Sequence, residues 1–518
     1  MKKIVIFIAL AIFAGAAVNA VPSKKKPTKP AAAQVDTIAM MIDKANKGDA
    51  KAQNTVGIWY YNGKDTLRQD YKKALNYWFL SAKQGNAYAI GNMAMCYQLG
   101  RGADKDSLTA VKLYKKALTQ GNKSLIPKHE QLVKNHGSLF SSLLLRDCYR
   151  DGIGTDVDQK KYAYYLEKAA SAGHEASQYE LALLLLNSNR ADKAASWMKK
   201  AAGQGNVGAT YYYGLLLFNG QGVAQNKSEG INYLKKASAK GFSMADYQLG
   251  RILYDGDGIT QDYAKAVEYL KKAASKNRVD AKWLLGKCYL DGTGVDQDYA
   301  SAAQWLSDAA KSHEDDLKAL LKNDKDGIFT QYLKGLKNYY VTKDFGAAID
   351  CFKKVEKAKN VEGTAMKALC LANEGYAKRN DKKAVKILNK IAGKSATADF
   401  ALSSMLEEGR GTDVDAKRAL SLLEQAADKG LASAQCALGD KCMTGDGVVK
   451  DMTKAARLYL LAEAQGRLTY LSAQNLAVCY EKKIGILPDL ANAAKRIEQL
   501  RGYKINDTLV EMLKSIDI

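Results

Sequence analysis

The sequence predicts an all-α fold, an α/α superhelical solenoid of about twelve helix-turn-helix repeats. The first observation is a repeat in the sequence itself. When residues 241–276 are moved forward by 36 positions, Ala245 falls on Ala281 and Leu249 falls on Leu285. A fixed period of this length is typical of units that bury their apolar faces only by stacking on their neighbours. The second observation is the helical spacing of apolar residues inside each unit.

The first half of the unit predicts a helix that ends at a glycine loop. Ala245, Leu249 and Leu253 lie four residues apart, which places their side chains on one helical face. Gly256 and Gly258 follow. Glycine takes left-handed backbone angles at little steric cost, so this pair is expected to end the helix and turn the chain.

The second half predicts a second helix, antiparallel to the first. Asp262 stands at the expected N-cap position, where its carboxylate can accept from free backbone N–H groups. Val267 and Leu270 then provide an inward apolar face. Gly241 lies just past the end of the second helix of the preceding unit, which is a common position for a helix to stop.

Twelve repeat starts can be placed along the chain, and most successive starts are 36 residues apart. They are Gly48, Gly85, Gly137, Gly173, Gly205, Gly241, Asn277, Gly327, Gly363, Lys394, Gly430 and Gly466. Two insertions, residues 121–136 and 313–326, interrupt the period. Each is expected to form a short extra helix or loop at a junction between repeats.

The first twenty residues are typical of a cleaved secretory signal peptide. Lys2 and Lys3 precede a short apolar run, and small residues precede the expected cut after Ala20. An uncleaved membrane anchor is the alternative, although the apolar run is short for a bilayer span. The chain is therefore expected to be exported, to the periplasm or out of the cell.

The remaining segments follow from composition and from the regularity of the repeat. Residues 21–35 are rich in proline and lysine and have no periodicity, so they are expected to form a flexible leader. Residues 327–393 lack the loop glycines and are expected to form tetratricopeptide-like hairpins, with a bend between two arms of the solenoid. The stripe Leu509, Met512, Leu513 and Ile516 is expected to cap the open end of the solenoid. The predicted segments are the signal peptide 1–20, the leader 21–35, the N-terminal arm 36–326, the irregular hairpins 327–393, the C-terminal arm 394–501 and the cap 502–518.

The formal net charge of +23 favours anionic partners. Acidic proteins, cell-wall polymers and membrane surfaces belong to this class, whereas nucleic acid is not expected for an exported chain. The alternative is that the positive charge belongs to a solvent-exposed surface without a binding role. Lysines such as Lys271 and Lys272, on the outer faces of the second helices, account for much of the charge.

The eight cysteines do not suggest a ladder of disulfides. Cys96, Cys148, Cys288 and Cys479 each precede a tyrosine near the end of a first helix. Equivalent positions in stacked hairpins lie roughly 8–10 Å apart, which is beyond the reach of a disulfide. These residues are expected to be buried thiols.

No catalytic, cofactor-binding or metal-binding residues are predicted. The carboxylates of the glycine loops, such as Asp255 and Asp257, lack the spacing of a calcium loop and are explained by turns and helix caps. The four histidines have no zinc-like partner set. No nucleophile with a base and no phosphate-binding loop is recognisable.

One motif resembles a known family. The pattern LG-x-x-Y-x-x-G-x-G-V, followed by D-x-x-x-A, resembles the Sel-one-like repeat, a relative of the tetratricopeptide repeat. It is carried here by Leu285, Gly286, Tyr289, Gly292, Gly294, Val295, Asp298 and Ala302. The resemblance implies a curved superhelix that binds other proteins, often as an adaptor in the cell envelope. A minority of relatives resemble cysteine-rich secreted proteins that bind or slowly hydrolyse β-lactams, and these carry a regular cysteine pair in each repeat that this chain lacks.

These observations favour an exported, non-enzymatic protein-interaction scaffold of the bacterial cell envelope. A β-lactam-binding or weakly β-lactamase-like protein and a basic cell-wall polymer binder are the alternatives. The partner groove is expected on the helical face opposite the core, at Tyr212, Gln248, Arg251 and Lys287. A recurring aromatic position either forms a column for a bound peptide or contacts the adjacent repeat, and it comprises Tyr179, Tyr211, Tyr247, Trp283 and Phe400.

Overall fold

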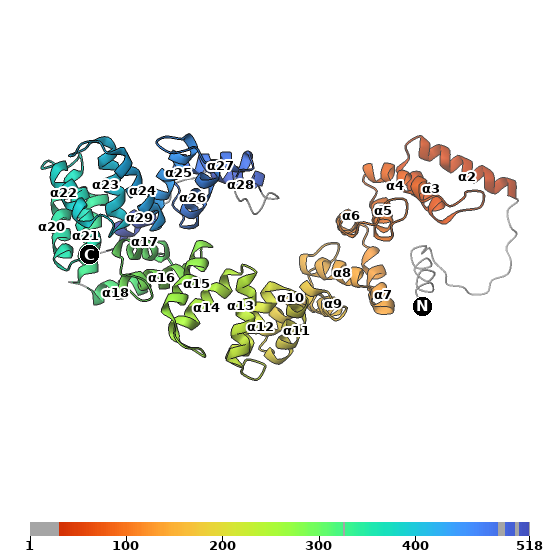
Figure 1. Ribbon diagram of the computed structural model, residues 1–518. Helices are drawn as coiled ribbons and strands as arrows, with labels where there is room; N and C mark the ends of the chain where they lie inside the picture. The colour runs from red at the N-terminus through yellow and green to blue at the C-terminus, as the bar shows by residue number, and fades with distance from the viewer. Residues whose placement is uncertain (1–30, 325–326, 485–492, 503–506, 517–518) are drawn as a thin grey trace. The chain divides into compact units, whose positions relative to one another are not determined.

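The computed structural model describes residues 31–324, 327–484, 493–502 and 507–516 (Figure 1). These residues form two compact units. The first unit runs to Leu216 and includes Gly220–Ala224, and the second comprises Leu217–Asn219 and the chain from Gln225 onward. The predicted signal peptide, residues 1–20, lies outside the described residues.

The described residues form helices throughout and no named strand, which confirms the all-α prediction. The first unit contains α2 (Ala31–Asn46), α3 (Ala50–Asn62), α4 (Tyr71–Lys83), α5 (Ala87–Leu99), α6 (Ser107–Thr119), α7 (Leu125–His136), α8 (Leu139–Asp151), α9 (Gln159–Ser171), α10 (Glu175–Asn187), α11 (Ala191–Gly203) and most of α12 (Val207–Asn219).

The described residues of the second unit add seventeen helices and one π-helical turn. They are α13 (Lys227–Ala239), α14 (Ser243–Asp255), α15 (Tyr263–Ser275), α16 (Val279–Asp291), α17 (Tyr299–Ala309), α18 (Glu314–Asn323), α19 (Ile328–Lys337), η1 (Asn338–Thr342), α20 (Phe345–Lys357), α21 (Val361–Ala372), α22 (Asp381–Ile391), α23 (Ala396–Glu408), α24 (Ala416–Asp428), α25 (Ala432–Thr444), α26 (Met452–Ala464), α27 (Tyr470–Glu481), α28 (Ala493–Arg501) and α29 (Thr508–Ser515).

Helices of the described chain pair as hairpins, in agreement with the predicted solenoid. Eleven consecutive pairs pack within the units, from α3 with α4 to α27 with α28. The remaining repeat, the fifth along the chain, comprises α12 and α13 and straddles the division between the units. The two predicted insertions, residues 121–136 and 313–326, contain the extra helices α7 and α18.

The loop inside each hairpin has the predicted construction. Gly256 and Gly258 adopt φ of 71° and 73°, which is the left-handed region that favours glycine. The backbone N–H of Asp262 donates to the carbonyl of Leu253 at 3.0 Å and closes the loop. The Asp262 carboxylate then accepts from the N–H of Lys265, also at 3.0 Å, and caps α15.

Glutamines join successive hairpins in three places. In one copy the side-chain amide of Gln53 donates to the carbonyl of Ala45 at 3.0 Å, and Gln84 donates to the Gln53 side chain at 2.8 Å. The same arrangement recurs around Gln178 and Gln435, and all three are buried. A buried polar group is stabilising only when its hydrogen bonds are made, so these bonds favour one register of stacking.

The repeat start predicted at Gly363 falls inside α21, whose N-cap is Asn360. The reason is that Lys359, with φ of 60°, holds the left-handed position that glycine holds in most junctions, so that the sequence signal is hidden. Gly363 is small for a packing reason. A Cβ there would lie 2.4 Å from a side-chain carbon of Val355.

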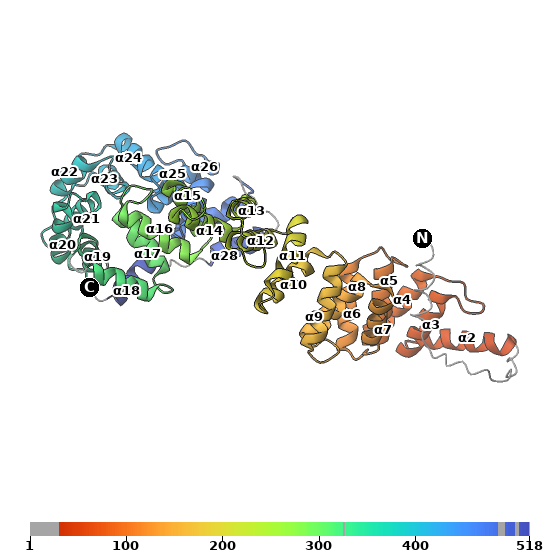
Figure 2. The same ribbon diagram turned by 90° about the horizontal axis from the view of Figure 1, so that it is seen from below.

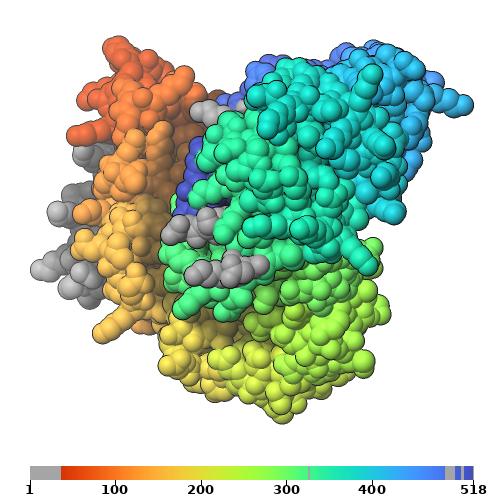
Figure 3. All heavy atoms as spheres, turned by 90° about the vertical axis from the view of Figure 1, so that its left-hand side faces the viewer, coloured from red at the N-terminus to blue at the C-terminus, as the bar shows by residue number. Residues whose placement is uncertain are grey.

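Two predicted segment boundaries differ from the structure. Residues 31–35 of the predicted leader belong to α2, since the alanine-rich stretch after Pro30 has a high helix propensity. The division into units falls near α12 and not at residues 327–393, which lie wholly within the second unit. The segment 327–393, where a bend is predicted, is curved: α19–α22 occupy the turn that brings α25–α27 opposite α15–α17 (Figures 1 and 2). Figure 3 faces the outer side of this turn, where the side chains of the teal helices α19–α22 pack together into one surface.

The apolar C-terminal stripe packs inside this curve, where we had expected it to cap the open end of the solenoid. Helix α29 packs on α17, α19 and η1. Met512 and Leu513 are buried, and the Lys337 ammonium donates to the carbonyl of Ile516 at 2.8 Å. The C-terminal helix therefore lines the inside of the second unit.

A pair of loop glycines tests the tight packing of the hairpins. A Cβ on Gly294 would lie 2.4 Å from the backbone oxygen of Tyr263, whereas a Cβ on Gly447, at the equivalent position, meets nothing within 4 Å. Both have positive φ, so Gly447→Ala should lower the free energy of unfolding by about 1 kcal/mol. Gly294→Ala should cost several times more, as measured by thermal unfolding. Equal losses in the two variants would contradict this account of the loop.

Candidate functional site

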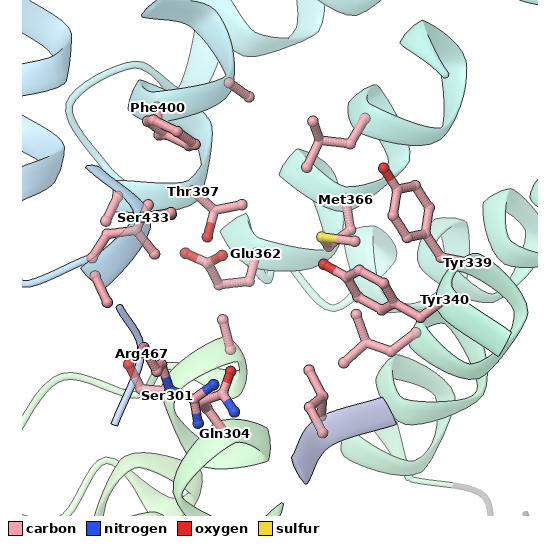
Figure 4. A pocket seen from close by; sticks show the side chains of 18 of the residues that line it. Ser301, Gln304, Tyr339, Tyr340, Glu362, Met366, Thr397, Phe400, Ser433 and Arg467 are labelled. Carbon is pink, nitrogen blue, oxygen red and sulfur yellow. The ribbon is translucent and has the colours of Figure 1, made fainter. Parts of the chain in front are cut away.

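A cavity of about 700 Å³ lies on the inner side of the second unit (Figure 4). This volume is within the range of small-molecule and peptide pockets. Its walls come from α17, α19 with η1, α21 and α23, and from the segments that lead into α25 and α27. Asp507 and Leu509, at the start of the C-terminal helix, complete the lining.

Equivalent positions of successive repeats supply much of the wall. Glu362, Thr397 and Ser433 each lie two residues after the N-cap of a first helix, in α21, α23 and α25. Residues six and nine positions after the N-cap also face the cavity, as Met366 and Leu369 do in α21. Because side chains at these spacings share one helical face, the stacked repeats present a continuous inner surface.

Glu362 is the unusual group in this wall. Its side chain is 8% exposed, and its Oε2 atom has no hydrogen-bond partner among the described residues. The pKa of Glu362 is raised to about 7, chiefly by burial and then by the negative charge of Asp298, while hydrogen bonds from Ser395 and Thr397 lower it. Figure 4 shows the carboxyl group beside Thr397, at the cavity.

An aromatic wall faces Glu362 across the cavity. Tyr339 and Tyr340 lie on η1, a π-helical turn of a kind often found at functional sites. Their ring centroids are 4.8 Å apart at an interplanar angle of 79°, an edge-to-face contact. Asn373 donates to the hydroxyl of Tyr339 at 3.3 Å, and Tyr340 is 37% exposed. One side of the cavity is therefore apolar and aromatic, and the opposite side carries the carboxyl group.

Asp308 holds the C-terminal helix against this site. The Asp308 carboxylate is 9% exposed and accepts from Thr508 at 2.6 Å, from Arg467 at 3.1 Å and from Lys282 at 3.3 Å. These partners belong to α29, to the segment before α27 and to α16. One carboxylate thus joins three parts of the chain that are distant in sequence.

The four predicted groove residues do not line this cavity, although they occupy the repeat positions that do. Tyr212 and Gln248 lie six residues after their N-caps, and Arg251 and Lys287 lie nine residues after theirs. Tyr212 and Lys287 are half-buried, and Arg251 is exposed. Gln248 is only 8% exposed, which leaves little of its side chain for a partner, because it lies in a closely packed part of α14.

The recurring aromatic position behaves differently along the chain. Tyr211 is buried, and Tyr179 lies 6.2 Å from the ring of Tyr212 on the adjacent repeat, so these rings contact neighbouring helices. Trp283 stacks on His313 at 5.0 Å. Phe400 instead lines the cavity. The sequence patterns did not single out Glu362, Thr397 or Ser433, because helical periodicity does not show that the position two residues after the N-cap lines a cavity.

The cysteines and histidines form no recognisable reactive site. All eight cysteines are free thiols and seven are buried. Burial raises the pKa of Cys96 to about 12, which disfavours the reactive thiolate. Burial lowers the pKa of His129 to about 4. Within residues 31–516 as described, no group of three or more His, Cys, Asp or Glu side chains could hold a metal ion.

The profile of the Sel1 repeat family matches the chain ten times. The matched residues are 50–86, 87–122, 147–174, 176–206, 207–242, 243–277, 279–313, 331–354, 396–431 and 432–466, which together cover more than half of the sequence. The chain belongs to the Sel1 repeat family. Proteins of this family generally mediate protein–protein interactions on a solenoid that is typically non-catalytic.

One relative and two solved structures are similar to this Sel1 repeat protein. The rat (Rattus norvegicus) DAP3-binding cell death enhancer 1 is 39% identical over 87 residues, which are 17% of this chain and 16% of the rat protein. A protective antigen of uropathogenic Escherichia coli displaying an SLR fold is 24% identical, with 93% of this chain and 98% of the antigen covered and a TM-score of 0.35. A Sel1 repeat protein from Oxalobacter formigenes is 22% identical, with 81% and 97% covered and a TM-score of 0.35.

The titration of Glu362 predicts a specific dependence of stability on pH. The folded chain binds this proton with a pKa of about 7, against an ordinary value of 4.5, so the folded state is stabilised at low pH and loses that stabilisation as the pH rises from 4.5 to 7. Glu362→Gln cannot titrate. Relative to wild type, this variant should therefore gain on the order of 3 kcal/mol between pH 4.5 and 8, measured by thermal unfolding of the second unit. The exposed Glu374→Gln is the matched control, and parallel profiles for wild type and Glu362→Gln would contradict the prediction.

The Asp308 contacts predict how the C-terminal helix is held. Asp308→Ala leaves Lys282 and Arg467, whose side chains are 11% and 22% exposed, without this carboxylate. Removing one partner of a largely buried ion pair costs about 3–5 kcal/mol. Amide hydrogen exchange across residues 507–516 should become faster in this variant. The control is Glu314→Ala, which removes an exposed partner of Lys318 and should change exchange there very little.

Proposed function

We propose that this Sel1 repeat protein is an exported scaffold of the bacterial cell envelope that binds a protein partner on the inner surface of its second unit. The observation that carries the proposal is the cavity of about 700 Å³ formed by equivalent positions of successive repeats. A surface of this kind exists before binding, so a partner segment would order little of the scaffold on docking. The family supports a role in protein interaction.

The proposed location is supported by the amino-terminal sequence. Lys2 and Lys3, the apolar run after them and Ala20 are typical of a signal peptide. None of the helices in the described part of the chain has the length and apolar character needed to cross a membrane. The formal charge of +23 favours an acidic partner.

The partner can be captured with a photo-crosslinker placed inside or outside the cavity. Ser433 is an exposed residue of the cavity wall, and Lys417 is an exposed residue on the second helix of a nearby hairpin. A photoreactive amino acid at Ser433 should yield a discrete crosslinked product in cells, whereas the same group at Lys417 should not. Fractionation of the same cells should place the product, with the chain beginning at Val21, outside the cytoplasm. Equal crosslinking from both positions would contradict binding at the cavity, and an uncut cytoplasmic chain would contradict export.

A further inference from the structure

The carboxyl group of Glu362 lies in the cavity wall without a complete set of hydrogen-bond partners. Its side chain is more than nine-tenths buried, and its Oε2 atom is unsatisfied within the described structure. We propose that the cavity binds a primary ammonium group carried on an apolar stem, with Glu362 as its counter-ion. This inference rests on the proposed function, because it names the chemical group that a peptide partner would place in the cavity.

The charges of the cavity wall leave Glu362 as the group that requires a partner. The other carboxylates are already engaged. Asp298 caps α17 and accepts from Ser301, Asp507 caps α29, and Glu374 pairs with Arg379. A carboxylate taken out of water is costly unless it is paired and hydrogen-bonded, so Glu362 favours a ligand that brings N–H donors and positive charge.

The cations of the wall are paired with other acids. Lys429 forms an ion pair with Asp399, and Arg467 pairs with Asp308. Arg410 lies 3.7 Å from an oxygen of Asp381 and donates to the carbonyl of Ala372 at 2.6 Å. The structure therefore provides a carboxyl group in the wall whose positive partner does not come from these neighbouring side chains.

The surroundings of the carboxyl suit a short apolar stem that ends in a small cation. Met366 and Leu369 line the cavity on the same helix as Glu362, and Phe400 lies on the adjacent repeat (Figure 4). These side chains can cover methylene groups by the hydrophobic effect. Tyr340 points into the cavity from the opposite wall, and its ring adds aromatic surface that can cover the stem.

Binding of an ammonium should be linked to release of a proton from Glu362. The groups that face this carboxyl are Asp298 from α17, Tyr332 from α19, and Asp399 with its partner Lys429 from α23 and the segment after α24. Asp298 and Asp399 favour the protonated acid in the empty cavity. A bound cation favours the carboxylate, so the affinity should rise with pH until Glu362 is ionised without a ligand, and then become constant.

Small probes test the cavity without the protein partner. The probes are Nα-acetyl-lysine methylamide, leucine methylamide with its free amino terminus, and the neutral Nα-acetyl-norleucine methylamide. Isothermal titration calorimetry on the full chain at pH 7, where the lysine side chain and a peptide amino terminus are mostly protonated, should show that at least one ammonium probe binds tenfold or more tightly than the neutral probe. The lysine and leucine probes distinguish a side-chain ammonium from a peptide amino terminus.

Two further measurements separate ion pairing from general apolar binding. Glu362→Gln should weaken binding of the ammonium probe at least tenfold, whereas Glu314→Gln, which changes an exposed carboxylate of α18 outside the cavity wall, should change its affinity by less than twofold. For the wild-type protein near pH 7, the measured binding enthalpy should depend on the ionisation enthalpy of the buffer, which reports release of a proton on binding. This measurement does not require a variant. Equal affinities for charged and neutral probes, or the absence of proton release, would overturn the inference. If those results were obtained while crosslinking from Ser433 still captured a partner, the proposed function would stand and this inference alone would fail.

Discussion

The fold depends on close stacking of small helical hairpins, because no single repeat can bury its own apolar face. Within a hairpin the two helices approach at residues such as Gly250, where a Cβ would lie 2.9 Å from the side chain of Leu270. Between hairpins the loop glycines approach backbone directly, as Gly294 does at Tyr263. Larger side chains at these positions would separate the helices and expose the apolar surface that stabilises the solenoid.

The same regular stacking produces the candidate site. A position that recurs every 36 residues in the sequence becomes a row of neighbours on one surface, so Glu362, Thr397 and Ser433 come together although they are far apart along the chain. In most solenoids such a row lines an open groove. Here the second unit curves, and the C-terminal helix packs inside the curve against α17 and α19. The groove is thereby narrowed to a cavity with an acidic side and an aromatic side.

Stability and function make opposite demands on Glu362. Burial and the nearby acids disfavour the charged form of Glu362, which lowers the free energy of unfolding of the ligand-free protein when this carboxyl group is ionised. Asp308 shows the contrasting case, a buried carboxylate with partners on three sides. The incompletely partnered carboxyl group of Glu362 is consistent with selection for binding, and the paired carboxylate of Asp308 with selection for structure.

The sequence by itself determined the solenoid. The 36-residue period, the Gly256 and Gly258 type of loop and the Asp262 type of cap are local signals, and they predicted the helix pairs and both insertions. The start of α21 was misplaced because Lys359 replaces the expected glycine.

Only the tertiary structure decided where the C-terminal stripe packs and that Glu362 lies in a cavity wall. Both depend on contacts between residues that are far apart in sequence, such as Thr508 with Asp308, 200 positions apart. Periodicity reports which face of a helix is buried, but it does not report how strongly successive hairpins rotate. The curvature of the second unit, and therefore the enclosure of the site, is the sum of many small packing angles that no short stretch of sequence encodes.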